Sequence, residues 1–156
     1  MSSSVAPVLR SFEDMEVGLS FVSANLSVEE KDIIDFARQF DPQPFHTDAR
    51  AAKDSLFGGL VASGWHTAAL TMRLLVDGFP IIGGTIGLGG EAAWPQPVRP
   101  GDVIHVEGKI IEVRRSQSHS DRGIVTVRLE TKNQRNEIAQ TLTAKLLVFR
   151  RKDMKG

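Results

Sequence analysis

The second half of the chain contains three long segments in which apolar and polar residues alternate, and this pattern constrains the fold more than any other. The segments lie at 103–113, 123–132 and 139–149. They are rich in Val, Ile and Thr, which favour extended backbone, and a period of two puts alternate side chains on one face of a strand. Val125, Val127 and Leu129 share such a face, as do Leu142, Ala144, Leu146 and Val148. We therefore predict long antiparallel strands with one buried sheet face.

The strongest helical segment precedes these strands. Ser63 is a plausible N-cap and Gly78 a plausible stop, so we predict a helix over 64–77. Apolar residues occur around most of its circumference, which indicates a helix covered on most sides. One buried helix packed against a long antiparallel sheet satisfies both patterns, so we predict an α+β domain.

Two shorter helices are expected nearer the N-terminus. Ser27 and Glu30 have capping-box spacing and are followed by apolar residues at helical intervals, which predicts a helix over 28–39. A second short helix is predicted over 49–54, capped by Thr47 or Asp48.

Composition restricts the class of protein. The 156 residues suit one domain, which we place at 12–150 between a flexible N-terminal arm, 1–11, and a C-terminal tail, 151–156. Nineteen basic and nineteen acidic residues balance, so we expect neither nucleic acid nor a membrane as a partner. There is no cysteine, which excludes a thiol nucleophile and a disulfide framework. The opening lacks the apolar core of a signal peptide, and we expect a cytoplasmic protein.

The segment FDPQPFHTD, at 40–48, carries the main candidate site. Pro42 and Pro44 fix their own φ and push the preceding residues toward extended geometry, so we predict a stiff, non-helical loop. Asp41 and His46 are five positions apart on this loop, and a carboxylate and an imidazole that share one water can manage its two protons. Spacing alone favours a structural explanation, in which Asp41 bonds backbone amides in an Asx turn while His46 packs at the base of the loop.

The start of the 64–77 helix adds a second element. A helix N-terminus offers free N–H groups and partial positive charge, which suit a developing oxyanion. Gly64 lets a ligand carbonyl approach the backbone, and Ser63 stands beside it. Together with the Asp41/His46 loop, these residues supply the parts for chemistry on a polarised carbonyl.

Over residues 12–149 the chain resembles the MaoC-like dehydratases, which include (R)-specific enoyl-CoA hydratases with the hotdog fold. The family's signature of Asp, then Asn, Pro and His is matched by Asp41, Gln43, Pro44 and His46, with glutamine in place of asparagine. The family's His-Gly step at the central helix corresponds to Ser63 and Gly64. A third match is WPQPVRPGD at 94–102, which leads into a long strand.

This resemblance implies a hotdog fold, in which a long curved antiparallel sheet wraps around a central helix. It implies that Asp41 and His46 hold the water delivered to an enoyl thioester, and that the Gly64 amide binds the thioester oxygen with Ser63 beside it. The substrate would be carried on CoA or an acyl carrier protein, and the protein would be a homodimer or an assembly of dimers. No cofactor or metal is expected.

Other residues have supporting roles or none in this interpretation. We place Gln43, His66 and Thr67 around the site without direct chemistry. The family's serine that steadies the aspartate aligns with Met72 by ungapped counting, so Thr67 or Thr71 would have to replace it. Two alternatives stay open beside the hydratase. A hotdog acyl-CoA thioesterase would use similar parts to direct water at the thioester carbonyl, and the Met72 departure suggests a non-catalytic protein that binds acyl thioesters.

Overall fold

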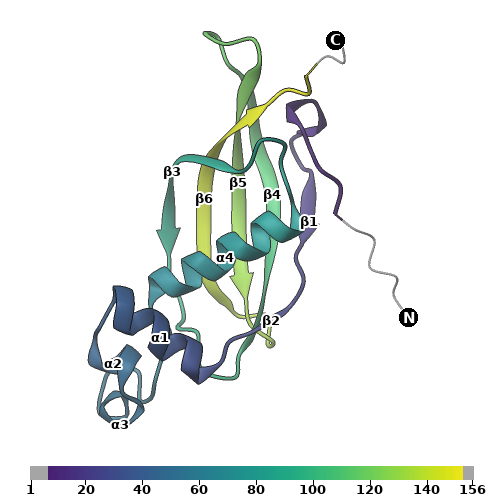
Figure 1. The fold of residues 1–156 in the computed structure, drawn as a ribbon. Coiled ribbons are helices and arrows are strands. Elements are labelled where there is room, and N and C mark those ends of the chain that lie inside the picture. The colour runs from purple at the N-terminus through teal and green to yellow at the C-terminus, as the bar shows by residue number, and fades with distance from the viewer. Residues whose placement is uncertain (1–6, 153–156) are drawn as a thin grey trace.

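The three alternating segments form the centre of one antiparallel sheet in the computed structural model, which describes residues 7–152. They are β4 (Val103–Arg115), β5 (Arg122–Lys132) and β6 (Ile138–Phe149). Three further strands complete the sheet: β1 (Ser20–Val22), β2 (Leu26–Ser27) and β3 (Ile86–Ala93). The order is β1-β4-β5-β6-β3, with β2 also paired to β4. The sheet curves around helix α4 (Gly64–Gly78), as Figure 1 shows.

The predicted inward face of the sheet is the one that packs against the helix. Val125 lies opposite Leu146, and Val127 lies opposite Ala144. Val125, Val127 and Leu129 are almost fully buried, and they form one core with Leu74 and Leu75 of α4. The α+β hotdog arrangement expected from the sequence is therefore confirmed.

Helix α4 begins and ends close to the predicted residues, but it is less covered than we expected. Its inner side is buried through Thr67, Thr71, Leu74 and Leu75. An apolar stripe on the other side is exposed, formed by Trp65, Ala69, Met72 and Val76. The expectation of cover on most sides is thus wrong for the single chain, because the sheet covers only one side of the helix.

Strand β3 forms one edge of the sheet next to this stripe. Every residue of β3 is exposed, and β3 pairs only with β6 among the described strands. A register shift between Gly87 and Gly89 marks the bulge that the glycine-rich sequence predicts here, and Gly89 has a φ of 152°. The outward side of β3 therefore has unpaired backbone groups.

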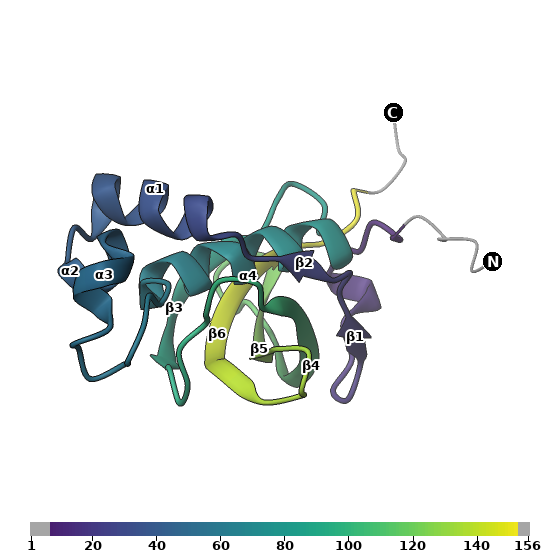
Figure 2. The same cartoon turned by 90° about the horizontal axis from the view of Figure 1, so that it is seen from below.

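The helices before α4 lie at one end of the molecule. They are α1 (Glu30–Phe40), α2 (Pro44–Thr47) and α3 (Ala49–Ala52). Figure 2 shows α1 on the outer side of α4, with the sheet on the other side. The predicted capping box at Ser27 does not form, because Ser27 belongs to β2 and pairs with Val103 while Glu29 becomes the N-cap of α1.

The loop at 40–48 also differs from the prediction, because α2 provides one helical turn within it. Pro44 is the first residue of that turn, where the missing N–H of proline costs nothing. Asp48 then caps α3 by accepting hydrogen bonds from the amides of Arg50 and Ala51. The segment is stiff as expected, but part of it is helical.

The ends of the chain are only partly described. The expected arm at 1–11 and the expected tail at 151–156 extend outside residues 7–152. Within the arm, the Arg10 amide donates to the Pro80 carbonyl and the Arg10 carbonyl accepts from Ile82, so pairing with the domain begins at Arg10. No helix in the part of the chain that the structure describes is long and apolar enough to cross a membrane.

Candidate active site

Asp41 and His46 are brought together by the turn between α1 and α2. Asp41 is the C-cap of α1, and its amide donates to the Ala37 carbonyl at 2.8 Å. His46 lies one turn into α2, and its side chain is almost completely buried. The Asp41 Oδ2 and His46 Nε2 atoms are 3.4 Å apart. The loop therefore does more than form a turn, because it directs a carboxylate and an imidazole at each other.

The protonation of His46 follows from its other ring nitrogen. His46 Nδ1 lies 2.6 Å from the Val61 carbonyl oxygen, which can only accept a hydrogen bond. Nδ1 of a neutral ring therefore carries the proton, and Nε2 presents a lone pair toward Asp41. Two acceptors cannot bond each other, but both can accept from one donor placed between them. A water molecule, with two hydrogens, is such a donor.

Asp41 is held by two further side chains. Ser63 Oγ donates to Asp41 Oδ2 at 2.7 Å, and Gln43 Nε2 donates to Asp41 Oδ1 at 2.6 Å. Burial alone would raise the pKa of the Asp41 carboxyl, but the bonds from Ser63 and Gln43 and the neighbouring His46 outweigh it and lower this pKa below its ordinary value. Asp41 is therefore a fixed carboxylate at neutral pH.

Ser63 is the N-cap of α4, as expected, but its side chain has a different partner from the expected substrate oxygen. Its hydroxyl is fully buried and is occupied by Asp41 and by the Trp65 amide, which donates to it as in an N-cap. The Ser63 side chain therefore steadies Asp41 and does not face a substrate oxygen. Met72, which ungapped counting places at the steadying position, is exposed instead. Thr71 is buried elsewhere, so neither threonine has to replace a missing serine.

Gly64 opens α4 beside the Asp41/His46 pair. No hydrogen bond to its amide is found within residues 7–152, as is usual for the first N–H groups of a helix. Gly64 and His46 both line a cavity of about 290 Å³ whose other walls include Phe57, Val98 and Trp94. A Cβ at position 64 would lie 2.8 Å from Trp94 Cε2, so only glycine fits beneath this indole.

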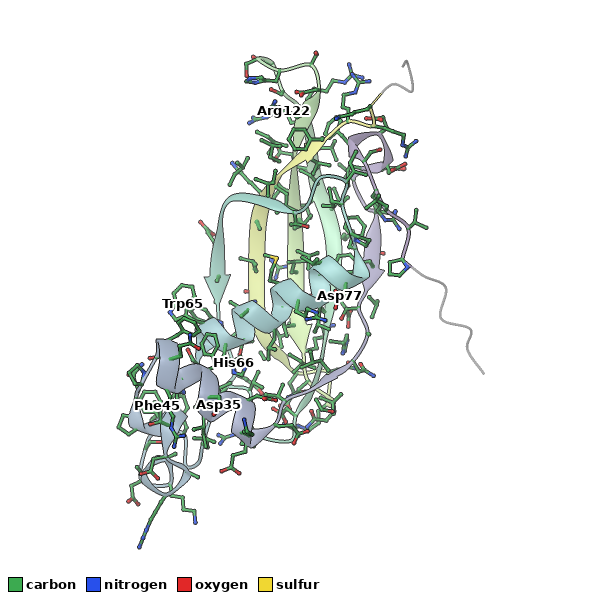
Figure 3. All side chains as sticks on the ribbon, viewed as in Figure 1. Asp35, Phe45, Trp65, His66, Asp77 and Arg122 are labelled. Atoms are coloured by element: carbon green, nitrogen blue, oxygen red, sulfur yellow. The ribbon has the colours of Figure 1, made fainter. Side chains whose placement is uncertain are left out.

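The two remaining expected residues, Thr67 and His66, lie on different sides of α4. Thr67 lines the same cavity as Gly64, with its hydroxyl 3.5 Å from the Ser63 carbonyl oxygen. His66 turns to the other side of α4, where its ring stacks on Phe36 of α1 at 4.6 Å. It lines a different pocket together with Asp32 and Leu70. Figure 3 shows His66 beside Trp65 at the N-terminal end of α4. The expected supporting role of His66 at the site is not seen, because the helical turn points it toward α1.

Trp94 and Gln140 are site residues that the sequence analysis did not single out. Trp94 follows β3 and forms a wall of the cavity, and its indole N–H donates to Gln140 Oε1 at 2.8 Å. A signal for Gln140 was present in the alternation of β6, because it shares the parity of the inward-facing Leu142 and Leu146. A polar side chain at such a position needs a buried partner.

This fold, with an Asp/His pair next to the Gly64 amide at the start of the central helix, defines a class of proteins. The chain belongs to the MaoC-like family: the family described as MaoC like domain matches residues 15–133. A solved structure of a MaoC-like dehydratase from Rhodospirillum rubrum is 55% identical with a TM-score of 0.88, covering 91% of this chain and 98% of that chain.

Two further relatives agree. The solved structure of the R-hydratase PhaJ1 from Pseudomonas aeruginosa is 26% identical with a TM-score of 0.72, covering 90% of this chain and 86% of that chain. Protein YdeM of Bacillus subtilis (strain 168) is 34% identical over 128 residues, which are 79% of this chain and 87% of that protein. The family and these neighbours support a hydratase or dehydratase role.

Proposed function

We propose that this protein adds water to, or removes it from, the double bond of an enoyl thioester, with Asp41 and His46 as the catalytic pair. The observation that carries the proposal is the pair of acceptors, Asp41 Oδ2 and His46 Nε2, which are 3.4 Å apart, with His46 lining the same cavity as Gly64. A water bound by both would be aligned for attack on a carbon in that cavity.

The steps of hydration follow from these positions. His46 Nε2 accepts one proton from the water as its oxygen bonds to Cβ, while Asp41 accepts a hydrogen bond from the other hydrogen. The electron pair of the double bond moves toward the thioester oxygen, where the Gly64 N–H and the start of α4 stabilise the charge. His46 then returns the proton to Cα. Dehydration is the same sequence in reverse, and no cofactor takes part in it.

A thioesterase would use the same parts to direct water at the thioester carbonyl. The non-catalytic alternative was suggested by Met72, which stands where the family has its steadying serine. Ser63 donates to Asp41 from another position, and this argues against that alternative. One experiment separates all three: incubate the protein with crotonyl-CoA and follow the conjugated double bond by absorbance and free thiol by a colorimetric reagent. We expect loss of the double bond without thiol release. Thiol release, or no reaction with retained binding, would refute the hydratase assignment.

We also propose that a second copy of the chain covers the α4 stripe and the β3 edge. The stripe of Trp65, Ala69, Met72 and Val76 starts near edge strand β3, where Trp65 meets Trp94, and Ile86 and Leu88 of β3 are also exposed. An apolar helix face next to a free strand edge is a surface that monomeric proteins avoid. A two-fold axis would let each copy cover the same surface of the other.

The oligomer is tested by light scattering, which should give twice the chain mass of 17.1 kDa. Leu88→Glu on the β3 edge, where Leu88 is 51% exposed, should shift the protein toward monomer. Val22→Glu is the matched control, because Val22 is equally apolar and 69% exposed but lies on β1 at the opposite edge of the sheet. A monomeric wild type, or equal effects of the two variants, would contradict this arrangement.

A further inference from the structure

The wall of the cavity formed by Trp94 is anchored from inside the protein. The indole lies over Gly64, and its N–H donates to Gln140, which is fully buried on β6. Trp94 also meets Trp65 edge-on, at 5.4 Å between ring centroids, and Trp94 itself is 40% exposed. The Gln140 bond is thus the one hydrogen bond of this side chain among the described residues.

Gln140 is itself held in one orientation. Its Nε2 donates to Thr71 Oγ1 at 3.1 Å, and Thr71 Oγ1 in turn donates to the Thr67 carbonyl. Thr131 Oγ1 lies 2.6 Å from Thr71 Oγ1, and because the Thr71 proton is already used, Thr131 must be the donor. An indole N–H can only donate, so the oxygen of Gln140 must face Trp94 and its nitrogen must face Thr71. The amide cannot flip without losing both bonds.

We propose that Gln140 is a positioning residue that fixes Trp94 as a wall of the acyl pocket beside Gly64 and thereby restricts the enzyme to short acyl chains. This inference rests on the proposed function. The cavity of about 290 Å³ is at the lower limit of the range for ligand pockets, and Trp94 is one of the residues that line it. A tryptophan released from Gln140 can tilt away from Gly64, because its indole has no other hydrogen-bond partner within residues 7–152. The pocket would then lengthen.

The first test compares chain-length profiles of hydration for 2-enoyl-CoA substrates of four and eight carbons. Gln140→Leu removes both hydrogen bonds at nearly constant volume. We expect the eight-to-four-carbon ratio of kcat/KM to rise by ~10-fold or more, the scale on which a pocket discriminates methylene groups. Thr131→Val is the matched control, because it removes another hydroxyl of the same network but leaves the Trp94–Gln140 bond intact. The eight-to-four-carbon ratio of Thr131→Val should equal that of wild type. General loosening of the fold would instead change this ratio in both variants.

A second variant covers the case in which Gln140→Leu fails to fold. Trp94→Phe keeps an aromatic ring but removes the indole N–H, and it should shift the ratio in the same direction. If Gln140 acts through Trp94, adding Gln140→Leu to Trp94→Phe should change the ratio no further. Additive shifts, or an unchanged ratio in Trp94→Phe, would overturn the inference.

A readout independent of turnover separates this inference from the proposed function. The chain has two tryptophans, so Trp65→Phe identifies the indole resonance of Trp94 in a proton–nitrogen spectrum. Exchange of this indole proton with solvent should be slow, and it should accelerate in Gln140→Leu. Binding of saturated butyryl-CoA and octanoyl-CoA, followed calorimetrically, should show the same change of preference. If Gln140→Leu changes the preference between the two ligands but no hydration is seen, the role of Gln140 is retained and the hydratase assignment is rejected. If hydration is seen but the ligand preference is unchanged in Gln140→Leu, the hydratase assignment is retained and the role of Gln140 is rejected.

Discussion

The molecule contains two networks of polar side chains a short distance apart, and they are built differently. In the network of Thr71, Thr131 and Gln140 every side-chain nitrogen and oxygen has a hydrogen-bond partner, and all three side chains are almost completely buried. In the pair of Asp41 and His46 two acceptors face each other with no protein donor between them. A satisfied buried network fixes side chains in place, whereas an incomplete one at a cavity edge is available to bind and activate a small donor.

The largest expected effect comes from breaking the incomplete pair. Asp41→Ala or His46→Ala should each lower kcat by ~10² or more, the usual scale for a positioned acid or base. The double variant should be little worse than either single one, because residues that act on one water lose most of their effect together. Steady-state hydration kinetics measure this, with thermal unfolding and light scattering to confirm an intact fold and assembly. If both single variants keep near-normal turnover, Asp41 and His46 form a structural turn only.

A smaller loss is expected when the support of Asp41 is removed. Ser63→Ala deletes the hydrogen bond to Asp41 Oδ2 and the cap of α4 at once. We expect about a tenfold fall in kcat, since a hydrogen bond to a charged group contributes roughly 1.5–3 kcal/mol, and about 1 kcal/mol less stability from the lost N-cap. Ser63→Thr, which keeps a hydroxyl, should recover both. Unchanged kcat in Ser63→Ala would mean that Asp41 needs no such support.

The hydrogen bonds that Asp41 accepts also predict that the stability of the fold depends on pH. The pKa of Asp41 is lowered in the folded protein, so its ionised form stabilises the fold above the unfolded pKa of about 3.9. This contribution is lost as pH falls through the folded pKa. Wild type should therefore exceed Asp41→Asn in unfolding free energy at pH 6, and the difference should shrink toward pH 3. Urea titrations at several pH values measure it, and a difference that grows on acidification would reverse the sign of the shift.

The smallest effect is expected in the satisfied network. Thr131→Val removes one buried donor, while Thr71 Oγ1 still accepts from Gln140. We expect a loss of ~1 kcal/mol in unfolding free energy with kcat for the short substrate unchanged. Denaturant unfolding and kinetics on the same preparation test this. A fall in kcat comparable to that of Ser63→Ala would erase the distinction between the two networks.

The long elements could be predicted because each carries its own periodic pattern. Strands β4, β5 and β6 alternate over ten or so residues, and α4 has both a cap and a stop. The short strands β1 and β2 could not be predicted, because two or three residues show no period and both depend on pairing with β4. The parity of Gln140 and Thr131 did indicate inward-facing side chains, but not the partners they would meet.

The candidate site was predictable in part for the same reason. Asp41, Gln43 and His46 are close in sequence, so their spacing carried the signal. The bond between Ser63 and Asp41 joins residues 22 positions apart, and the bond between Trp94 and Gln140 joins residues 46 apart. Such contacts depend on how α1 and α4 meet the sheet, which periodicity does not specify. Counting along α4 to Met72 failed because a steadying hydroxyl can approach Asp41 from the helix start.

The contact between Gly64 and Trp94 constrains the order in which this site can change during evolution. A methyl group at position 64 would collide with the indole, so alanine fits there only if the Trp94 side chain is displaced. Once position 94 has become smaller, alanine at 64 is no longer penalised, and a return to tryptophan is then blocked until glycine is restored. The two positions therefore form an epistatic pair, and related sequences should differ at 64 only where they already differ at 94.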